Sequence, residues 1–595
     1  MIKNIFLLCL SSLAYSISLT SQNLAIDRKT DWTIAGLRDT STVGFSVIDL
    51  EYSNLHSDGI TANDSIFSDI LNNLNSNGNI LIFPAGDFLF NKTINLKSKT
   101  ILKGQGSQHT ILISNLDGLD HSIMIQGESF NLDTLYITEN ITQQTNYIKF
   151  NTLNNFQVDD WVKILFNDSN LISSNWALKS VGQILQVKEV YTDSIIFKSK
   201  LRLNIDTNKH PFLIKMNPIN NVGIECLKIH RINSSSPKQR SNIVFKNAVN
   251  CWVTGVESEK CTFAHVDIRS SSNIQVSKSY FHHAFEYGGG GRAYGVMIHS
   301  TSNECLIEDN IFNHLRHSMI LQSGANANVF ALNYSHDPNR TEIPFDFAGD
   351  MVLHGNYPFL NLFEQNIGQN ISVDNSHGPN GKYNTYFRNR AELWGIYITS
   401  SNSPFLNLIG NEITNMTPPY STFNYTINGL NHYIFANNNK GVILPNSSDT
   451  LLDKSYAYNN KPDFIEESMW AKIGKNIFFN NSTIPAKIRF ETDSVNLTYC
   501  KLISKDTSLT NRNLNILNNK LSVSPNPFSN VLNINSLKQI KRIEIFNNIG
   551  QKIYTDKQAV VLINTSNWKN GLYFIKIHYL NNEFATFKVL KNSFS

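Results

Sequence analysis

The chain has 595 residues, of which 41% are hydrophobic and 16% charged, so it holds enough apolar material for a large core and exceeds one ordinary globular domain. The formal net charge is only +4, which gives no reason to expect a nucleic-acid partner. Beyond the N-terminus, no stretch approaches the roughly 18 apolar residues of a membrane helix, so we expect no transmembrane segment.

The N-terminus has the pattern of a secretory signal peptide. Lys3 supplies a positive charge, and residues 5–14 form an apolar run too short to span a bilayer. Small residues follow at Ser16, Ser18 and Ser21, where a signal peptidase would cut. We therefore predict a signal peptide over residues 1–21 and an exported protein.

An amphipathic segment over residues 62–76 predicts a helix. Its apolar residues share one helical face: Ile66, Ile70, Leu71 and Leu74. Such a helix can cover the open end of a stacked β structure, whose unpaired edge would otherwise invite aggregation. We assign residues 30–144 to this N-terminal cap and the first coils. Residues 145–215 then carry longer strands with tight turns and predict a small β-rich insertion.

A repeat organises the middle of the chain. Short apolar runs end near an asparagine, and the steps between these asparagines are 23, 33, 23 and 22 residues: Asn310, Asn333, Asn366, Asn389 and Asn411. This period is too short for paired helices and indicates a solenoid with three strands and three turns per coil. We expect the asparagines to form a structural ladder and the main coils to cover residues 216–490.

The cysteines give little sign of disulfides or metal binding. Six are present, and Cys9 lies inside the predicted signal peptide. The remaining number is odd and no CxxC spacing occurs: Cys226, Cys251, Cys261, Cys305 and Cys500. We interpret them as buried single thiols and expect no zinc site.

A linker over residues 491–518 precedes a separate C-terminal region, 519–595, whose alternating segments predict an antiparallel β-sandwich. Three of its motifs resemble the C-terminal sorting domain of the type IX secretion system: Pro525-Asn526-Pro527-Phe528, the segment around Gly550, and Asn570-Gly571-Leu572-Tyr573. The resemblance implies that the protein is secreted or attached to the outer cell surface, with the type IX machinery as a partner.

The N-terminal motifs carry a second resemblance. HSDGITANDS at residues 56–65, FPAGDF at 83–88 and ILKGQG at 101–106 are similar to the opening of the pectate-lyase superfamily of rhamnogalacturonase and epimerase-like proteins. The resemblance implies a right-handed parallel β-helix and leaves the reaction type open. The predicted fold class is therefore all-β: a right-handed parallel β-helix with an N-terminal helical cap, a small β insertion and a C-terminal antiparallel β-sandwich.

Polar residues at the ends of successive short strands predict a functional column, one residue per coil: His299, Gln322, His354, His377 and Thr399. We assign proton transfer to His354 and His377, because imidazole titrates near neutral pH, and substrate binding to His299 and Gln322. The alternative is a stack of turn histidines that bond only to backbone.

Two coils are longer than the rest, and their extra loops, near 282–296 and 336–353, are expected to wall one cleft. The first contains four consecutive glycines, 288–291, typical of a loop that closely approaches a ligand. We place Tyr287, Arg292 and His317 among the substrate-binding residues of this cleft.

Arginines near the column are candidates for binding a sugar carboxylate, because guanidinium pairs with it bidentately: Arg316 and Arg390 as charge neutralisers, and Arg388 in binding. Surface ion pairing is the alternative interpretation for all three.

Histidine and arginine together favour a polysaccharide lyase that cleaves a uronic-acid polysaccharide by β-elimination. A glycoside hydrolase would instead use two carboxylates, from the candidates Asp346, Asp350 and Asp374. A third alternative is a non-catalytic surface adhesin that binds glycans. No cofactor is required by the sequence. Calcium remains an optional helper, and no compact acidic loop motif supports it.

Overall fold

The computed structural model describes most of the chain: residues 24–38, 42–150, 155–234, 238–398, 403–422, 425–446, 451–474, 482–493, 495–500, 521–524, 528–536, 540–556, 562–579 and 584–592. The predicted signal peptide, Thr399 and the Pro525-Asn526-Pro527 motif lie outside these residues. Two compact units are present, Met1–Lys501 and Leu502–Ser595. No described helix is both long and apolar enough to cross a membrane.

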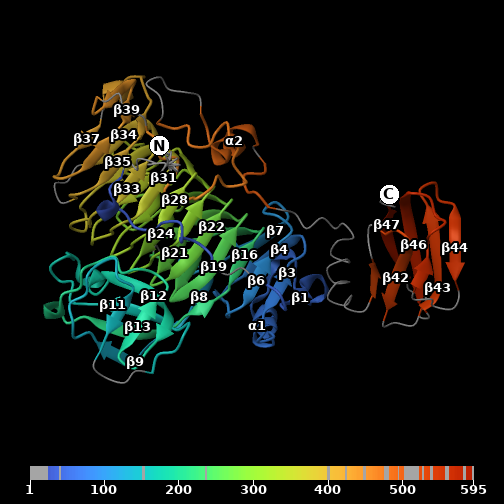
Figure 1. Ribbon diagram of the computed structural model, residues 1–595. Helices are drawn as coiled ribbons and strands as arrows, with labels where there is room; N and C mark the ends of the chain where they lie inside the picture. Colours follow the sequence, from blue (N-terminus) through green and yellow to red (C-terminus); the bar gives the residue numbers. More distant parts are fainter. Residues whose placement is uncertain are drawn as a thin grey trace, which may run out of the picture. The chain divides into compact units, whose positions relative to one another are not determined.

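The main part of the first unit is a stack of coils (Figure 1). Each coil has three short strands, and parallel pairing with the next coil places these strands on three faces. One complete coil is β22 (Ser272–Ser277), β23 (Tyr280–Ala284) and β24 (Tyr294–His299). These strands pair in parallel with β25 (Leu306–Glu308), β26 (Ile311–Asn313) and β27 (His317–Leu321) of the next coil. The predicted all-β class and parallel β-helix are confirmed.

The first face contains, in spatial order, β1 (Ser46–Asp49), β3 (Asn79–Ile82), β6 (Thr100–Lys103), β16 (Gly223–Glu225), β19 (Ala248–Thr254), β22, β25, β28 (Val329–Ala331), β31 (Leu362–Glu364), β33 (Thr385–Phe387), β35 (Asn407–Ile409) and β38 (Tyr433–Phe435). A two-residue strand, β15 (Ile219–Asn220), also pairs with β19.

Two long strands, β32 (Ile367–Val373) and β34 (Arg390–Ile398), pair on the second face with their first residues and on the third face with their last. The other strands of the second face are β2 (Asp58–Ala62), β4 (Gly86–Phe90), β7 (Thr110–Ser114), β17 (Lys228–Arg231), β20 (Glu257–Cys261), β23, β26, β29 (Tyr334–His336), β36 (Glu412–Ile413), β39 (Asn437–Asn439) and β40 (Val442–Leu444). The other strands of the third face are β5 (Ile94–Asn95), β8 (Ile123–Gln126), β18 (Ile243–Lys246), β21 (Ala264–Arg269), β24, β27, β30 (Met351–Leu353) and β37 (Thr426–Ile427).

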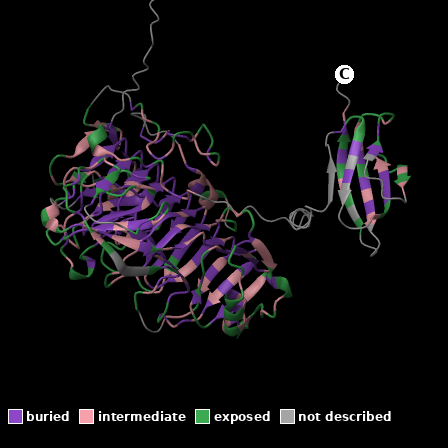
Figure 2. Ribbon diagram, turned by 60° about the horizontal axis from the view of Figure 1, so that its bottom comes forward, coloured by how far each residue is buried: buried purple, intermediate pink, exposed green. Residues whose placement is uncertain are grey.

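Alternate side chains of every face point inward and form one continuous core along the coils, which Figure 2 shows as buried strands. Within it, the rings of Phe330 and Phe363 stack 5.2 Å apart, and those of Phe363 and Tyr386 stack 4.8 Å apart. Because each coil repeats the same apolar positions, like residues stack on like residues down the axis.

The predicted asparagine ladder is confirmed. Each side-chain amide donates to the side-chain oxygen of the next asparagine, at 3.0 Å for Asn310 to Asn333 and 2.9 Å for Asn333 to Asn366. The ladder continues through Asn389 and Asn411 and ends on Asn437. A second ladder, Asn328–Asn361–Asn384, runs down another corner and was not predicted. Buried amides are satisfied in both ladders, so their role is structural.

The helical cap and the insertion are both present. The helix α1 (Asp64–Asn72) buries Phe67 and Leu71 against the first coils. The insertion is an antiparallel sheet in the order β10 (Tyr147–Lys149), β13 (Ser194–Phe197), β12 (Gly182–Val190), β11 (Trp161–Leu165), β14 (Phe212–Asn217) and β9 (Glu128–Tyr136). It begins with β9 rather than at residue 145, because β9 pairs with β14.

The parallel coils end earlier than predicted, at β39, to which β40 pairs antiparallel, rather than continuing to residue 490. The described residues 451–474 and the helix α2 (Pro485–Thr492) instead return along the outside of the coils, where Trp470 and Ile484 pack against second-face residues such as Ile311. We call the described residues 451–474, 482–493 and 495–500 the returning segment.

The returning segment ends in a disulfide between Cys500 and Cys226, whose Cα atoms lie 5.5 Å apart. The interpretation of five single thiols is therefore wrong for these two residues, which are separated by 274 positions and meet only because the chain turns back. Cys251, Cys261 and Cys305 are free and buried, as expected.

The second unit contains two antiparallel sheets. One has the order β41 (Leu521–Ser524), β42 (Val531–Ser536) and β45 (Leu562–Asn564), and the other β44 (Lys552–Asp556), β43 (Ile540–Asn547), β46 (Gly571–Tyr579) and β47 (Phe584–Lys591). Leu532 and Ile563 of the first sheet share a core with Ile543, Ile575 and Val589 of the second. This arrangement is the β-sandwich that the sequence predicts.

Candidate active site

The third face presents a row of outward polar side chains at the ends of its strands. Strand register aligns Ile298 with Leu321, Leu321 with Leu353 and Leu353 with Val373. The next residue in each coil forms the row: His299, Gln322, His354 and Asp374. The predicted column is thus correct for its first three members and wrong for His377, because the turn after β32 is three residues longer than the turn after β30.

His377 nevertheless reaches the same place from that longer turn. Its ring centroid lies 4.9 Å from that of His354, and the ring of His317, from the start of β27, lies 5.6 Å from His354 on another side. We call His317, His354 and His377 the histidine cluster. His317 and His354 are 8% and 7% exposed, and His377 is half-buried in the turn after β32. Three imidazoles in contact give a site that can accept and move protons.

Hydrogen bonds fix the tautomers of two cluster members. Nδ1 of His354 lies 2.8 Å from Oδ2 of Asp374, and a carboxylate can only accept, so Nδ1–H donates and Nε2 carries the lone pair. Nδ1 of His317 lies 2.9 Å from the carbonyl oxygen of Gly349 and donates in the same way. Both histidines therefore present Nε2 as a proton acceptor.

Burial and neighbouring charges shift the pKa values of this site. Burial alone would raise the pKa of Asp374, but the hydrogen bond from His354 and the electrostatic interaction with it outweigh burial and hold the pKa at about 2. Burial, together with electrostatic interactions with His354 and Arg316, lowers the pKa of His317 to about 3. Burial also lowers the pKa of His377. At neutral pH Asp374 is ionised, while His317 and His377 are neutral bases.

Arg316 adds a cation directly before His317. Its charge acts on His317 and on Tyr294, whose ring lies 5.3 Å from the ring of His317. The Nη1 atom of Arg316 is buried and has no hydrogen-bond partner within the described part of the chain. A buried guanidinium nitrogen without an acceptor can gain one from a bound carboxylate.

His299, at the other end of the row, is held by a residue that the sequence analysis missed. Its Nε2 lies 2.8 Å from Oδ1 of Asp267, a fully buried carboxylate that also pairs with Arg269 at 2.7 Å. Burial would raise the pKa of Asp267, but His299 and Arg269 lower it. Aligning VDIR of β21 with VMIH of β24 places Arg269 opposite His299 and Asp267 two positions earlier, on the same side of the strand as Arg269, so the register could have indicated Asp267.

The insertion supplies a wall of the site through its loop between β11 and β12. Trp176 of this loop is 59% exposed, and its ring stands edge-on to that of His377 at 5.5 Å. The backbone N–H groups of Ser173 and Ser174 donate to Oδ1 of Asn356, at 3.1 and 3.3 Å. The loop has no repeat in its sequence, so its place beside His377 could not be predicted.

The two long loops predicted to lie together do so: a Cβ added to Gly288 would collide with the side chain of Thr341. Within the first loop, Arg292 pairs with Glu286. Tyr287 packs edge-on against His314, with ring centroids 4.9 Å apart, and its hydroxyl accepts from the Ala284 N–H. Tyr287 therefore contacts a neighbour of the second face, away from its expected place in a cleft with His354.

The structure contradicts the substrate-binding role of Arg388 and the charge-neutralising role of Arg390. Arg388 is 1% exposed, and its guanidinium donates to carbonyl oxygens of the returning segment: Leu451, Asp453, Ala471 and Ile473. Arg390 is 6% exposed, pairs with Glu412 at 2.8 Å and donates to Ser482. Both bind the chain that folds back over them, which the repeat pattern does not reveal.

Two of the three carboxylates proposed for the hydrolase alternative are engaged in hydrogen bonds within the fold. Asp350 is 1% exposed and accepts from Ser335 and from the N–H groups of Gln369 and Asn370. Burial raises its pKa to about 6 despite these bonds. Asp346 accepts from Trp394 Nε1 at 3.1 Å and from the Tyr420 hydroxyl at 2.7 Å. Only Asp374 lies in the histidine cluster.

A group of ligand-type side chains able to hold a metal ion lies on the second face, apart from the histidine cluster. Glu257, Glu259 and His282 place one ligand atom each within 4.8 Å of the others. Lys228 already bridges both carboxylates, at 2.8 and 2.7 Å, and would have to leave before a cation could bind. A role for calcium stays a prediction.

Comparison with known proteins bears on the C-terminal unit. Residues 522–592 match the family described as the secretion system C-terminal sorting domain. The protein is therefore secreted or attached to the cell surface, and its secretion machinery is a partner. No curated protein matches the chain as a relative.

Solved structures similar to the first unit are distant. The tailspike protein gp49 from Pseudomonas phage LKA1 has 14% identity and a TM-score of 0.46, over 62% of this chain and 64% of that one, so the chain spans less than two thirds of the tailspike. The exopolygalacturonase from Thermotoga maritima has 12% identity and a TM-score of 0.36, over 64% and 83%. The Streptococcus pneumoniae surface protein and adhesin PfbA has 10% identity and a TM-score of 0.30, over 65% and 97%.

Proposed function

We propose that this secreted protein is a polysaccharide lyase that cleaves a uronic-acid polysaccharide by β-elimination at the histidine cluster. The observation that carries the proposal is the His354–Asp374 pair, at 2.8 Å, in contact with two further imidazoles and beside Arg316. Elimination needs a cation for the uronate carboxylate and a base for the proton on the adjacent carbon. The site contains both.

In this mechanism the Arg316 guanidinium, whose buried Nη1 has no hydrogen-bond partner in the described structure, binds the uronate carboxylate and stabilises the negative charge that develops there. Nε2 of His354 takes the proton from C5, while Asp374 orients the ring and stabilises the imidazolium that forms. The electron pair of the broken C–H bond forms the C4–C5 double bond and expels the glycosidic oxygen at C4. That oxygen leaves as a hydroxyl once it takes a proton from the imidazolium or from water.

The hydrolase alternative has less support in the geometry. It needs two carboxylates on opposite sides of the scissile bond. Asp350 has the raised pKa of a general acid, but it is buried and its oxygens already accept three hydrogen bonds. Asp346 is engaged by Trp394 and Tyr420, which leaves Asp374 without a partner carboxylate among the candidates.

The deciding assay is incubation of the purified chain with a panel of uronic-acid polysaccharides. A lyase gives an unsaturated product that absorbs in the ultraviolet, in step with new reducing ends. Reducing ends without that absorbance would replace the proposal with a hydrolase. Binding without any product would favour the glycan-binding adhesin.

Trp176 is expected to form a platform for a sugar ring next to His377, because its exposed face can stack on the apolar face of the ring. Trp176→Ala should raise KM about tenfold or more, since a stacking contact contributes roughly 0.5–1.5 kcal/mol beyond the area it buries, and kcat should change little. Trp176→Phe should restore most of the affinity. Steady-state kinetics on one polysaccharide checks both, and an unchanged KM in Trp176→Ala would remove the loop from the site.

A further inference from the structure

The third-face row that leads to the histidine cluster continues beyond His299, toward the N-terminal coils. Strand register aligns His299 with Arg269 of β21, and Arg269 with Lys246 of β18. A core residue precedes each cation, Ile268 and Phe245 respectively, so both cations point outward. Neighbouring coils lie about 4.8 Å apart, so two cations follow one another on the face that carries the histidine cluster.

The insertion adds a third cation at the same place. Lys163 of β11 reaches the turn after β21, where its Nζ donates to Oγ of Ser270 at 3.1 Å. Val162 and Ile164, on either side of Lys163, lie in the core of the insertion, so the lysine points out of that core. Since Ser270 directly follows Arg269, Lys163 joins the row at the coil of Arg269.

We call Arg269, Lys246 and Lys163 the basic end of the row. The carboxylate that contacts this end, Asp267, is shared between Arg269 at 2.7 Å and His299 at 2.8 Å. Lys163 and Lys246 form no ion pair with any residue that the structure describes. Because Asp267 balances Arg269, the positive charge that remains at this end comes from the two lysines.

Lys163 shows why an anion would be bound here. Its ammonium donates to a neutral hydroxyl, Ser270 Oγ, and this hydroxyl donates in turn to the carbonyl oxygen of Ser300 at 3.2 Å. Burial lowers the pKa of Lys163 to about 8, and no neighbouring charge contributes to the shift. The ammonium form still prevails at neutral pH, and a charge removed from water without a counter-ion costs free energy. A carboxylate of a ligand would reduce that cost.

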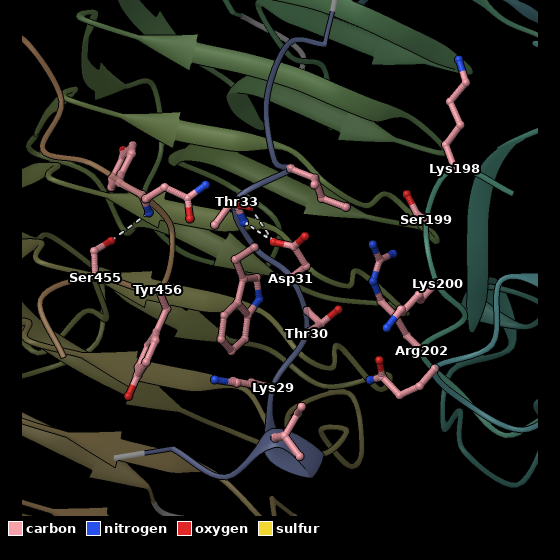
Figure 3. A pocket seen from close by; sticks show the side chains of 16 residues that line it. Lys29, Thr30, Asp31, Thr33, Lys198, Ser199, Lys200, Arg202, Ser455 and Tyr456 are labelled. Carbon is pink, nitrogen blue, oxygen red and sulfur yellow. Dashed lines mark hydrogen bonds between the residues drawn. The ribbon is translucent and has the colours of Figure 1, made fainter. Parts of the chain in front are cut away.

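Cations on the first-face side of the insertion differ in being paired. A cavity of about 500 Å³ opens there, where the insertion, the N-terminal part of the chain and the returning segment meet (Figure 3). Lys198, in its lining, pairs with Asp159 at 2.7 Å. Arg202 pairs with Glu304, and Asp31 keeps its negative charge in the lining. The basic end of the row is therefore better suited to an anion than this cavity.

We propose that the basic end of the row is a distal subsite, which binds the carboxylate of a uronate residue in the same polymer that the histidine cluster cleaves. The need for an anion rests on Lys163 and Lys246, whereas the choice of a uronate rests on the proposed function. The polymer lies along the third face, and the sugars over the coils of His299 and Gln322 connect the subsite with His354. Each ammonium pairs with a carboxylate through a charge-assisted hydrogen bond.

Calorimetric titration of the purified full chain with a galacturonic acid hexamer tests the subsite. Lys163→Met/Lys246→Met should bind the hexamer at least about tenfold more weakly than the wild type, because two charge-assisted contacts are lost. If the hexamer is cleaved, its KM should rise by a similar factor while kcat changes little. Lys149→Met is the matched control, since it removes an exposed lysine of β10 in the same insertion, and it should bind as the wild type does. The fully methyl-esterified hexamer should bind equally to the wild type and the double variant.

Three results would overturn the inference: no hexamer binding by the wild type, equal hexamer affinity in the double variant, or a methyl ester that binds the wild type as tightly as the free acid. Failure of the proposed function looks different, since the wild type would then release no unsaturated product while the double variant still bound the hexamer more weakly. Thermal unfolding checks the fold, and Lys163→Met should unfold at no lower temperature than the wild type, because it removes a charge without a counter-ion. If it did unfold earlier, Lys246→Met alone would provide the same binding test.

Discussion

His354→Ala is expected to lower kcat at least about a hundredfold, the usual contribution of a positioned general base, with little change in thermal stability. His354 is 7% exposed but lies outside the apolar core of the coils, and its loss removes one hydrogen bond, to Asp374. Asp374→Asn should also lower kcat strongly, because an amide can donate to Nδ1 and so favour the tautomer with the proton on Nε2. Steady-state kinetics and a thermal melt of each variant provide the measurement.

His314→Ala is the matched control. His314 is a half-buried histidine that also pairs with a carboxylate, Asp337 at 2.7 Å, but it lies beside the second face. It should keep full activity. If His354→Ala and His377→Ala were both stable and fully active, the chemistry would sit elsewhere. Early unfolding of both would show that these histidines are structural.

Arg388→Ala is expected to destabilise the first unit by more than about 3 kcal/mol. Its guanidinium donates to four backbone carbonyls of the returning segment, and each buried carbonyl left without a donor costs about 1–3 kcal/mol. Arg388→Lys should recover only part of this loss, because one ammonium group cannot reproduce the planar fork. Denaturant unfolding followed by tryptophan fluorescence reports the change, since Trp470 lies in the same segment.

Arg316→Ala is expected to have the opposite effect: activity falls strongly while stability changes little. Arg316 has a guanidinium nitrogen without a partner in the described structure, so its loss should cost little stability and much activity. Equal unfolding midpoints for Arg388→Ala and the wild type would contradict the structural role assigned to Arg388. A stable and fully active Arg316→Ala would remove Arg316 from the site.

Arg388 and Arg316 show why the role of a polar residue beside the coils is hard to predict from sequence. Arg388 directly follows a short apolar strand of a coil, and Arg316 directly precedes one. In the sequence, both therefore occupy similar positions beside the coils. Only the returning segment distinguishes them, because it covers Arg388 and leaves Arg316 beside the histidine cluster. The disulfide between Cys226 and Cys500 arises from the same return of the chain.

The sequence by itself determined the coils, the asparagine ladder, the capping helix, the insertion and the sorting domain. These features are local: strand alternation and turn chemistry repeat every coil, and the ladder needs only one asparagine per coil at a constant step. The first three members of the third-face row, His299, Gln322 and His354, were predictable for the same reason.

The tertiary structure alone decided which side chains meet. The turn after β32 is three residues longer than the turn after β30, so Asp374 takes the place in the row that was predicted for His377. His377 lies in that longer turn, and its ring still contacts His354. Trp176 reached the same cluster from an insertion with no repeat. Strand periodicity determines the direction in which a side chain points, whereas its neighbours depend on turn lengths and on segments that return from far along the chain.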